Sequence, residues 1–507
     1  MREAASALAA RARKQVRDPS AALFGTQLIS IVLRLGSNLV LAHLLVPRDF
    51  GLLAITTIVA TALVMLSELG TWVAIVRQAD SVDRRWLDQM WTLQAGRGVL
   101  LWLIALALTP AIASSYGEPQ LLWLLPVANF WLIILGLESL QPFIRNKDLR
   151  PGLSLKLQLI TQAVGSAFSI VGALIYPSPW ALIGGLLAGA VANTVMSHIW
   201  GGAGWPKPRM SRQFLREQWK LASWLSLSTA LGFFGGQIDR LIFPAWFGTT
   251  AFGIYSIALT LALFPLQLGQ RWADTLYMPA IAKLSQAHAP DAARQLRSLC
   301  RTVVTYAAVG SALLAGMGSP FFHALYPQRF AEAGTYIQVL AVTTYFTFIT
   351  YLHRRVFLYQ GMTRFEAAIE ASRLFLFLAG VGCVVLLLRK PSPIEYVGIY
   401  ALVQAIVYGG LLIVGRIRGL VHLRDDLPGH ILFVLILAGM AVLDATVEAR
   451  FGAIAALLAS GTLGALIALA TAARLGLPKL PTQQASPTPP PQDPAAVPEI
   501  FDPLQET

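Results

Sequence analysis

The chain is poor in cysteine and in charge. It has two cysteines among 507 residues, Cys300 and Cys383, and their number and spacing give neither a disulfide framework nor a metal-binding motif. Only 13% of the residues are charged and 56% are hydrophobic, which excludes an ordinary soluble protein. The seven histidines are scattered, and we expect His353, beside Arg354 and Arg355, to be a solvated helix end and not a ligand. The composition therefore indicates a membrane protein.

Acidic residues are also scarce, with 26 Asp and Glu against 39 Lys and Arg. If the N-terminus is cytoplasmic, five of the basic residues lie in outer loops and six within apolar stretches, so the large majority face the cytoplasm. This bias predicts that both termini are cytoplasmic. It explains the net charge of +13 by membrane topology, with membrane lipid headgroups as contacts and no nucleic acid as partner.

The sequence lacks the signals of an enzyme. The two longer cytoplasmic segments, 201–218 and 273–300, contain no glycine-rich phosphate loop and no nucleophile with a base. The outer loops are short, whereas a membrane polysaccharide polymerase or ligase would usually carry a large one. We therefore expect a protein that is not an enzyme and that needs no cofactor, apart from H⁺ or Na⁺ as a coupling ion.

Long apolar runs are what the sequence does have. They are long enough to cross a hydrocarbon core of roughly 30 Å, and their continuous apolar character predicts helices and not the strands of a barrel. The fold class is therefore an all-α polytopic membrane protein with about 14 transmembrane helices. The predicted spans are 21–45, 50–75, 89–110, 120–140, 153–176, 180–200, 219–246, 250–272, 301–326, 334–355, 366–388, 393–414, 430–447 and 452–473.

A short turn between two apolar limbs occurs twice in the chain. Phe50-Gly51 in the first turn matches Phe252-Gly253 in the second at an offset of 202 residues. Because six spans separate the two hairpins, both halves enter the membrane in the same direction, which predicts two six-helix lobes related by a parallel pseudo-twofold axis. The predicted domains are a basic cytoplasmic interfacial segment (1–20), an N-terminal lobe (21–200), a cytoplasmic linker (201–218), a C-terminal lobe (219–414), an extra helix pair (430–473) and a disordered Pro-rich cytoplasmic tail (478–507).

Arg34 is the most informative polar residue, because a cation within a bilayer marks a functional cavity by default. Gln27 and Asn38 lie within about 40° of it on the first span. The offset of 202 places Arg240 on the equivalent face of the seventh span, one turn away. Two such cations could share one polyanion.

Four further residues complete the predicted site. Gln237 and Asp239 lie beside Arg240 on the seventh span, and Glu68 and Arg97 lie at similar depths in the second and third spans. Arg97 has two interpretations, since it could bind cargo or neutralise Glu68 as a buried ion pair. Glu68 and Asp239 are the candidates for binding a coupling ion.

The two hairpins carry a resemblance to a known family. The first contains Leu33-Arg34 and then residues 44–54, LLVPRDFGLLA, followed by Glu68-Leu69-Gly70. The second contains residues 237–240, QIDR, and residues 252–258, FGIYSIA; Trp91 and Arg97 also fit the pattern. This sequence resembles the Wzx-type polysaccharide flippases of the multidrug/oligosaccharidyl-lipid/polysaccharide exporter superfamily.

The resemblance implies a transporter of the bacterial inner membrane. Such a protein would flip polyprenyl-pyrophosphate-linked oligosaccharide repeat units from the cytoplasmic to the periplasmic leaflet, by ion-coupled alternating access, for exopolysaccharide, capsule or O-antigen synthesis. A polysaccharide polymerase and export machinery would be its partners. We expect spans one, two, seven and eight to line the cavity, with Arg34, Arg97 and Arg240 attracting the pyrophosphate. The alternatives are a peptidoglycan-precursor (lipid II) flippase, a multidrug exporter of the same superfamily, and a membrane polymerase or ligase.

Overall fold

The computed structural model describes residues 19–77, 83–148, 150–202, 204–278, 280–281, 292–388, 391–418 and 423–475. Within these residues every regular element is a helix, which confirms the all-α prediction. The predicted N-terminal segment, up to residue 18, and the predicted Pro-rich tail lie outside the described residues. The elements are α2 (Pro19–Leu44), α3 (Pro47–Leu66), α4 (Thr71–Arg77), α5 (Arg84–Tyr116), α6 (Leu121–Asn129), α7 (Trp131–Gly136), α8 (Gln141–Lys147), α9 (Gly152–Ile175), α10 (Pro179–Gly201), α11 (Arg212–Trp272), the π-helix η1 (Ala273–Tyr277), α13 (Ala292–Leu325), the 3-10 helix η2 (Gln328–Phe330), α14 (Ala333–Tyr359), α15 (Thr363–Leu388), α16 (Pro393–Ile417), α17 (Leu423–Phe451) and α18 (Ala453–Leu475).

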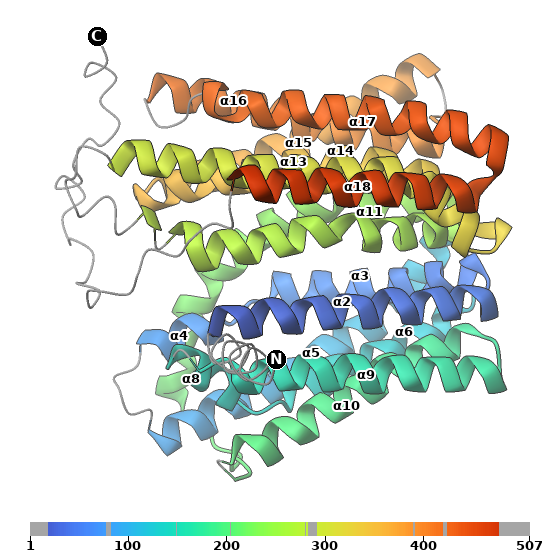
Figure 1. Ribbon diagram of the computed structural model, residues 1–507. Helices are drawn as coiled ribbons and strands as arrows, with labels where there is room; N and C mark the ends of the chain where they lie inside the picture. Colours follow the sequence, from blue (N-terminus) through green and yellow to red (C-terminus); the bar gives the residue numbers. More distant parts are fainter. Residues whose placement is uncertain are drawn as a thin grey trace, which may run out of the picture. The chain divides into compact units, whose positions relative to one another are not determined.

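The chain divides into two compact units (Figure 1). Unit 1 is Met1–Ser256 and holds α2 to α10 and most of α11. Unit 2 is Ile257–Thr507 and holds the end of α11 and the helices from α13 to α18. The boundary falls within α11, and the lobe boundaries at 200 and 219 remain a prediction.

The first hairpin turn is built as the sequence predicts. α3 begins at Pro47, whose fixed φ suits the first helical position and whose missing N–H needs no partner there. The carboxylate of Asp49 accepts a hydrogen bond from the backbone N–H of Val46 at 3.2 Å, which caps the helix start. Two residues are therefore enough to reverse the chain between α2 and α3.

The predicted span 50–75 is not one helix. α3 ends at Leu66, and α4 starts at Thr71 after Gly70, which has φ 64°. This left-handed conformation favours glycine and interrupts the helix. The stretch 120–140 is divided as well, into α6 and α7, and Gln141–Lys147 follows Leu121–Gly136 at a bend of 54°.

Gly248 divides α11 into two helical segments. It has φ 84° and ψ 168°, a conformation outside the helical region that a side chain would strain. The break lies where the sequence predicts the second turn, between the spans 219–246 and 250–272.

Among the described residues, eleven helices are long and apolar enough to cross a membrane, or twelve if the bent pair is one span. Each of the fourteen predicted spans overlaps a helix, yet the number that cross the bilayer and the pseudo-twofold symmetry of the lobes remain predictions. The chain is a multi-pass membrane protein.

In unit 1, α9 packs against α2 on one side and against α10 on the other (Figure 1). The contact between α9 and α10 is close, because a Cβ on Gly185 would lie 1.8 Å from Oγ of Ser169. Small residues at such positions let membrane helices approach each other. In unit 2, α13 packs against α14, α17 and α18.

Candidate functional site

A polar cavity of about 270 Å³ lies in unit 1, within the group formed by α2, α7, α9 and α10. Its lining combines one cation, three amides, two hydroxyls and an indole with a few apolar side chains. The lining residues are Arg34, Trp131, Leu135, Gln158, Thr161, Gln162, Ala190, Asn193 and Thr194. Such a set can bind an anion and can hydrogen-bond a polar ligand.

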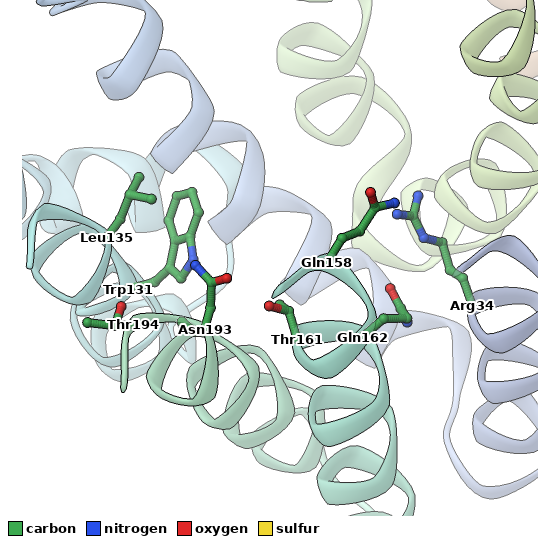
Figure 2. A pocket seen from close by; sticks show the side chains of 9 residues that line it. Arg34, Trp131, Leu135, Gln158, Thr161, Gln162, Asn193 and Thr194 are labelled. Atoms are coloured by element: carbon green, nitrogen blue, oxygen red, sulfur yellow. The ribbon is translucent and has the colours of Figure 1, made fainter. Parts of the chain in front are cut away.

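Arg34 is the charged member of this lining. α2 places it half-buried, facing α9, and Figure 2 shows its guanidinium and the carboxamide of Gln158 pointing toward one another. No ion pair joins Arg34 to a carboxylate among the residues that the structure describes. A guanidinium carries five N–H donors, so Arg34 can offer charge-assisted hydrogen bonds to a ligand in the cavity.

Gln27 does not line the cavity, but it accepts a hydrogen bond from the lining residue Gln158. Gln158 Nε2 donates to Gln27 Oε1 at 3.0 Å and to Ser30 Oγ at 3.2 Å, and both acceptors are buried. These bonds tie α9 to α2 beside Arg34. Asn38, the third predicted residue of α2, is half-buried and lies outside the lining.

The two threonine hydroxyls of the lining act as hydrogen-bond donors to backbone carbonyls within the described part of the chain. Thr161 donates its proton to the carbonyl of Leu157 at 2.7 Å, and Thr194 donates to the carbonyl of Ile134 at 3.0 Å. Each oxygen keeps lone pairs for a donor such as a sugar hydroxyl. The carboxylate of Glu138 lies close to the side chain of Asn193 and is not part of the lining.

Arg97 binds the end of α3. Its Nη2 donates to the carbonyl of Val64 at 2.6 Å, and its Nε donates to Ser67 Oγ at 3.1 Å. Glu68 instead accepts from the backbone N–H of Gly70 at 3.0 Å. No ion pair between Arg97 and Glu68 is found in the described part of the chain, so Arg97 satisfies the free carbonyl of a helix C-terminus.

The three predicted residues of α11 are not among the residues that line this cavity. Asp239 is 2% exposed, and its Oδ2 accepts a hydrogen bond from Tyr255 at 2.6 Å. Gln237 Oε1 and Arg240 Nε are buried without a hydrogen-bond partner among the described residues. The cavity thus unites Arg34 with α9 and α10 and not with Arg240, and it shares only α2 with the spans predicted to line it.

The two duplicated turns contact each other through their glycines. A Cβ on Gly51 would lie 1.9 Å from the carbonyl oxygen of Thr249, and one on Gly253 would lie 1.8 Å from the carbonyl oxygen of Pro47. Pro47 and Thr249 are themselves related by the offset of 202, so the contact is reciprocal. Only glycine fits at either position without a shift of the backbone.

A polar cluster of Arg48, Glu118 and Thr249 joins the same two turns. Arg48 Nη2 and Glu118 Oε2 form an ion pair at 2.5 Å, and Thr249 donates to Glu118 Oε1 at 2.6 Å. Glu118 lies in the loop between α5 and α6. Burial raises the pKa of its carboxyl, but the hydrogen bonds from Arg48 and Thr249 and the charge of Arg48 together lower it below its ordinary value.

The family described as "Polysaccharide biosynthesis protein" matches residues 40–334, more than half of the chain. The chain belongs to this family. The matched region begins within α2 and includes both duplicated turns and most of the cavity lining.

Two relatives of this polysaccharide biosynthesis protein are bacterial. An "uncharacterized membrane protein in cps region" of Klebsiella pneumoniae is 23% identical over 263 residues, which are 51% of this chain and 54% of the relative. The lipopolysaccharide biosynthesis protein WzxC of Escherichia coli K12 is 20% identical over 257 residues, which are 50% and 52%. The chain spans about half the length of the curated relatives that it matches.

Solved structures show the fold. The lipid II flippase MurJ, in an inward closed conformation, is 11% identical with a TM-score of 0.67, covering 90% of this chain and 98% of that one. A multidrug resistance MATE transporter of the MOP superfamily, in an inward-facing conformation, is 12% identical with a TM-score of 0.58, covering 77% and 94%. The chain therefore has the fold of these two transporters.

Glu118 makes the stability of this family member dependent on pH. A carboxyl whose pKa is lowered by folding stabilises the folded state above its ordinary value of 4.5, and this stabilisation is lost as the pH falls through the lowered pKa. We expect Glu118→Gln to unfold at a lower temperature than the wild type at neutral pH, with the difference shrinking as the pH falls below 4.5. Thermal unfolding in detergent measures this, with the exposed Glu217→Gln as control. A constant difference at every pH would contradict it.

Proposed function

We propose that this protein transfers a lipid-linked oligosaccharide with an anionic phosphate headgroup between the leaflets of a bacterial inner membrane. The carrier would be polyprenyl pyrophosphate, and the direction would be from the cytoplasmic to the periplasmic leaflet. The observation that supports this best is the cavity lined by Arg34, a cation with no carboxylate partner among the described residues. The family and the relative named for lipopolysaccharide biosynthesis agree with a sugar-polymer precursor as cargo.

The cavity offers complementary groups to both parts of such a ligand. Arg34 provides donors and positive charge for phosphate oxygens. Across from it, Trp131 provides an aromatic face, and Asn193 and Thr194 provide hydrogen-bonding groups for hydroxyls (Figure 2). The lipid tail would stay in the bilayer while the headgroup occupies the cavity.

The same cavity disfavours a multidrug exporter. Organic cations bind best beside acidic side chains, whereas the lining contains an arginine and neither aspartate nor glutamate. A lipid II flippase is the second candidate, because lipid II is also a pyrophosphate-linked sugar. The likeness to MurJ is one of fold, so a transfer assay with both lipids must decide between the two cargoes.

Coupling to H⁺ or Na⁺ completes the proposal. Asp239, which is buried, and Glu68 are the candidates from the sequence, and Glu138 joins them because its carboxylate lies close to the cavity residue Asn193. Alternating access would open and close the contact between the two duplicated turns. A polysaccharide polymerase is a proposed partner on the periplasmic side. Both termini of this chain would lie in the cytoplasm.

Reconstituted transfer tests the proposal. Purified protein in liposomes would be given polyprenyl-pyrophosphate-linked oligosaccharide, lipid II or an uncharged glycolipid, and transfer would be scored by an impermeant sugar-cleaving enzyme. We expect transfer of the pyrophosphate-linked oligosaccharide and none of the uncharged lipid. Preferential transfer of lipid II would favour the second candidate, and no transfer of any anionic lipid would refute the proposal.

The Gln158→Ala variant locates transfer in this cavity. Losing one neutral hydrogen-bonding group costs about 0.5–1.5 kcal/mol, which is roughly a 2- to 10-fold lower rate. Gln213→Ala, which changes an exposed amide of α11, is the matched control. The unfolding temperatures of both variants are measured as well. An unchanged unfolding temperature of Gln158→Ala would show that slower transfer does not come from destabilisation through loss of the Gln158–Gln27 hydrogen bond.

A further inference from the structure

Unit 2 contains a buried cluster of three metal-ligating side chains. The Cys300 thiol of α13, the His353 imidazole of α14 and the Asp426 carboxylate of α17 each offer a ligand atom, and these atoms lie within 4.8 Å of one another. The residues are 6%, 2% and 0% exposed. The prediction that His353 is a solvated helix end is therefore wrong, because α13, α16 and α17 cover the α14 face that carries it.

The carboxylate of Asp426 is only half satisfied. His353 Nε2 lies 2.7 Å from its Oδ2, and Tyr408 donates to the same oxygen at 2.7 Å. Its Oδ1 is buried and has no hydrogen-bond partner among the described residues. A buried carboxylate oxygen without a donor is costly, and a bound cation is one of the few groups that can compensate it.

A second layer of hydrogen bonds holds these groups in place. The hydroxyl of Tyr408 also lies 2.9 Å from Nε2 of His430, and the hydroxyl of Tyr345 lies 3.0 Å from Nδ1 of His430. Metal-ligating carboxylates and imidazoles are commonly oriented by outer hydrogen bonds of this kind. The chain Asp426–Tyr408–His430–Tyr345 thus holds Oδ2 of the carboxylate, the same oxygen that His353 contacts, and leaves Oδ1 for another partner.

We propose that Cys300, His353 and Asp426 bind a zinc-like divalent transition metal. Thiolate, imidazole and carboxylate together are a zinc ligand set, whereas Na⁺, Mg²⁺ and Ca²⁺ prefer oxygen alone. Three protein ligands leave the fourth position of a tetrahedron to water. The metal replaces the direct His353–Asp426 contact and joins α13, α14 and α17, so it stabilises unit 2 independently of the cargo that unit 1 carries.

Metal content and cobalt spectroscopy test the site. We expect the full-length protein, purified without chelator, to hold one equivalent of zinc and to bind Co²⁺ with a thiolate-to-cobalt charge-transfer band. Cys300→Ser abolishes the band, whereas Cys383→Ser, which changes the exposed cysteine of the same unit, retains it. Tyr408→Phe removes the two outer hydrogen bonds of this hydroxyl, to Asp426 and to His430, and is expected to weaken binding about 10- to 100-fold.

A chelator experiment on the wild type covers the case in which the variants fail to fold. We expect chelation to lower the unfolding temperature and added Zn²⁺ to restore it. No bound metal, no charge-transfer band and no response to chelator would overturn the proposal and leave a His–Asp pair within a polar core. A band that persists in Cys300→Ser would overturn the ligand assignment.

Discussion

Replacing Gly51 or Gly253 by alanine is expected to force the two duplicated turns apart. In each variant the new Cβ would lie less than 2 Å from a backbone oxygen of the other turn, at Thr249 or Pro47. Backbone cannot rotate away as a side chain can, so the turns must separate. Overpacking of this kind costs typically 1–3 kcal/mol. Under the proposed alternating access, it disfavours the state in which the turns touch.

Accessibility of Thr249 measures this shift. Thr249 is 3% exposed, so a cysteine there should react slowly with an impermeant maleimide in a Cys383→Ser background. A change of about 2 kcal/mol corresponds to roughly a 30-fold change in the populations of two states. We expect Gly51→Ala to accelerate the labelling of the cysteine at position 249 roughly 30-fold and to reduce export of the polysaccharide.

Gly36→Ala is the matched control for this experiment. Gly36 lies in α2 of the same unit, and a Cβ there would meet nothing within 4 Å. Labelling and export of the control should match those of the wild type. Unchanged labelling in both Gly51→Ala and Gly253→Ala would mean that the turns do not separate as the protein works.

More of the helical architecture than of the functional site could be predicted from the sequence. Long apolar runs fixed the fold class, and Pro47 and Gly248 mark the two turns because each residue has a backbone requirement that is visible in the sequence. The repeat of Phe50-Gly51 at an offset of 202 pointed to the pair of turns that the structure shows in contact. The break after Leu66 was missed, because Gly70 is one of 41 glycines in the chain and its left-handed conformation cannot be seen in the sequence.

The functional residues depend on distances that a sequence does not contain. Arg34 was found because a cation in an apolar run is rare, whereas Gln158 and Trp131 resemble the many amides and indoles of membrane helices. The cluster of Cys300, His353 and Asp426 has no spacing motif, since its members come from three helices. These residues are far apart in the sequence and come close together only when the helices pack.

Replacing Arg34 by methionine is expected to abolish most transfer of an anionic lipid-linked oligosaccharide. Methionine keeps an unbranched stem and removes the charge and all five donors. A hydrogen bond to a charged group contributes about 1.5–3 kcal/mol, so transfer should fall roughly 10- to 150-fold. Arg34→Lys keeps the charge without the planar fork and should recover part of the rate.

The measurement combines transfer kinetics in liposomes with export in a strain that lacks the transporter. A loss of phosphate binding raises the KM for the pyrophosphate-linked lipid. Damage to the conformational cycle instead lowers kcat, so that transfer is slow even when the lipid is saturating. Arg216→Met, which removes an exposed arginine of α11, controls for the change in net charge. Equal unfolding temperatures of the variants exclude a folding defect.

Arg240→Met decides whether the binding site extends beyond the cavity of Figure 2. The sequence paired Arg34 with Arg240, but the cavity lining includes only Arg34. If one cavity binds the headgroup, Arg240→Met should leave the KM near the wild-type value while Arg34→Met raises it. Equal and non-additive losses in both single variants and the double variant would instead place the two cations on the same phosphate group, because residues that share one ligand do not act independently.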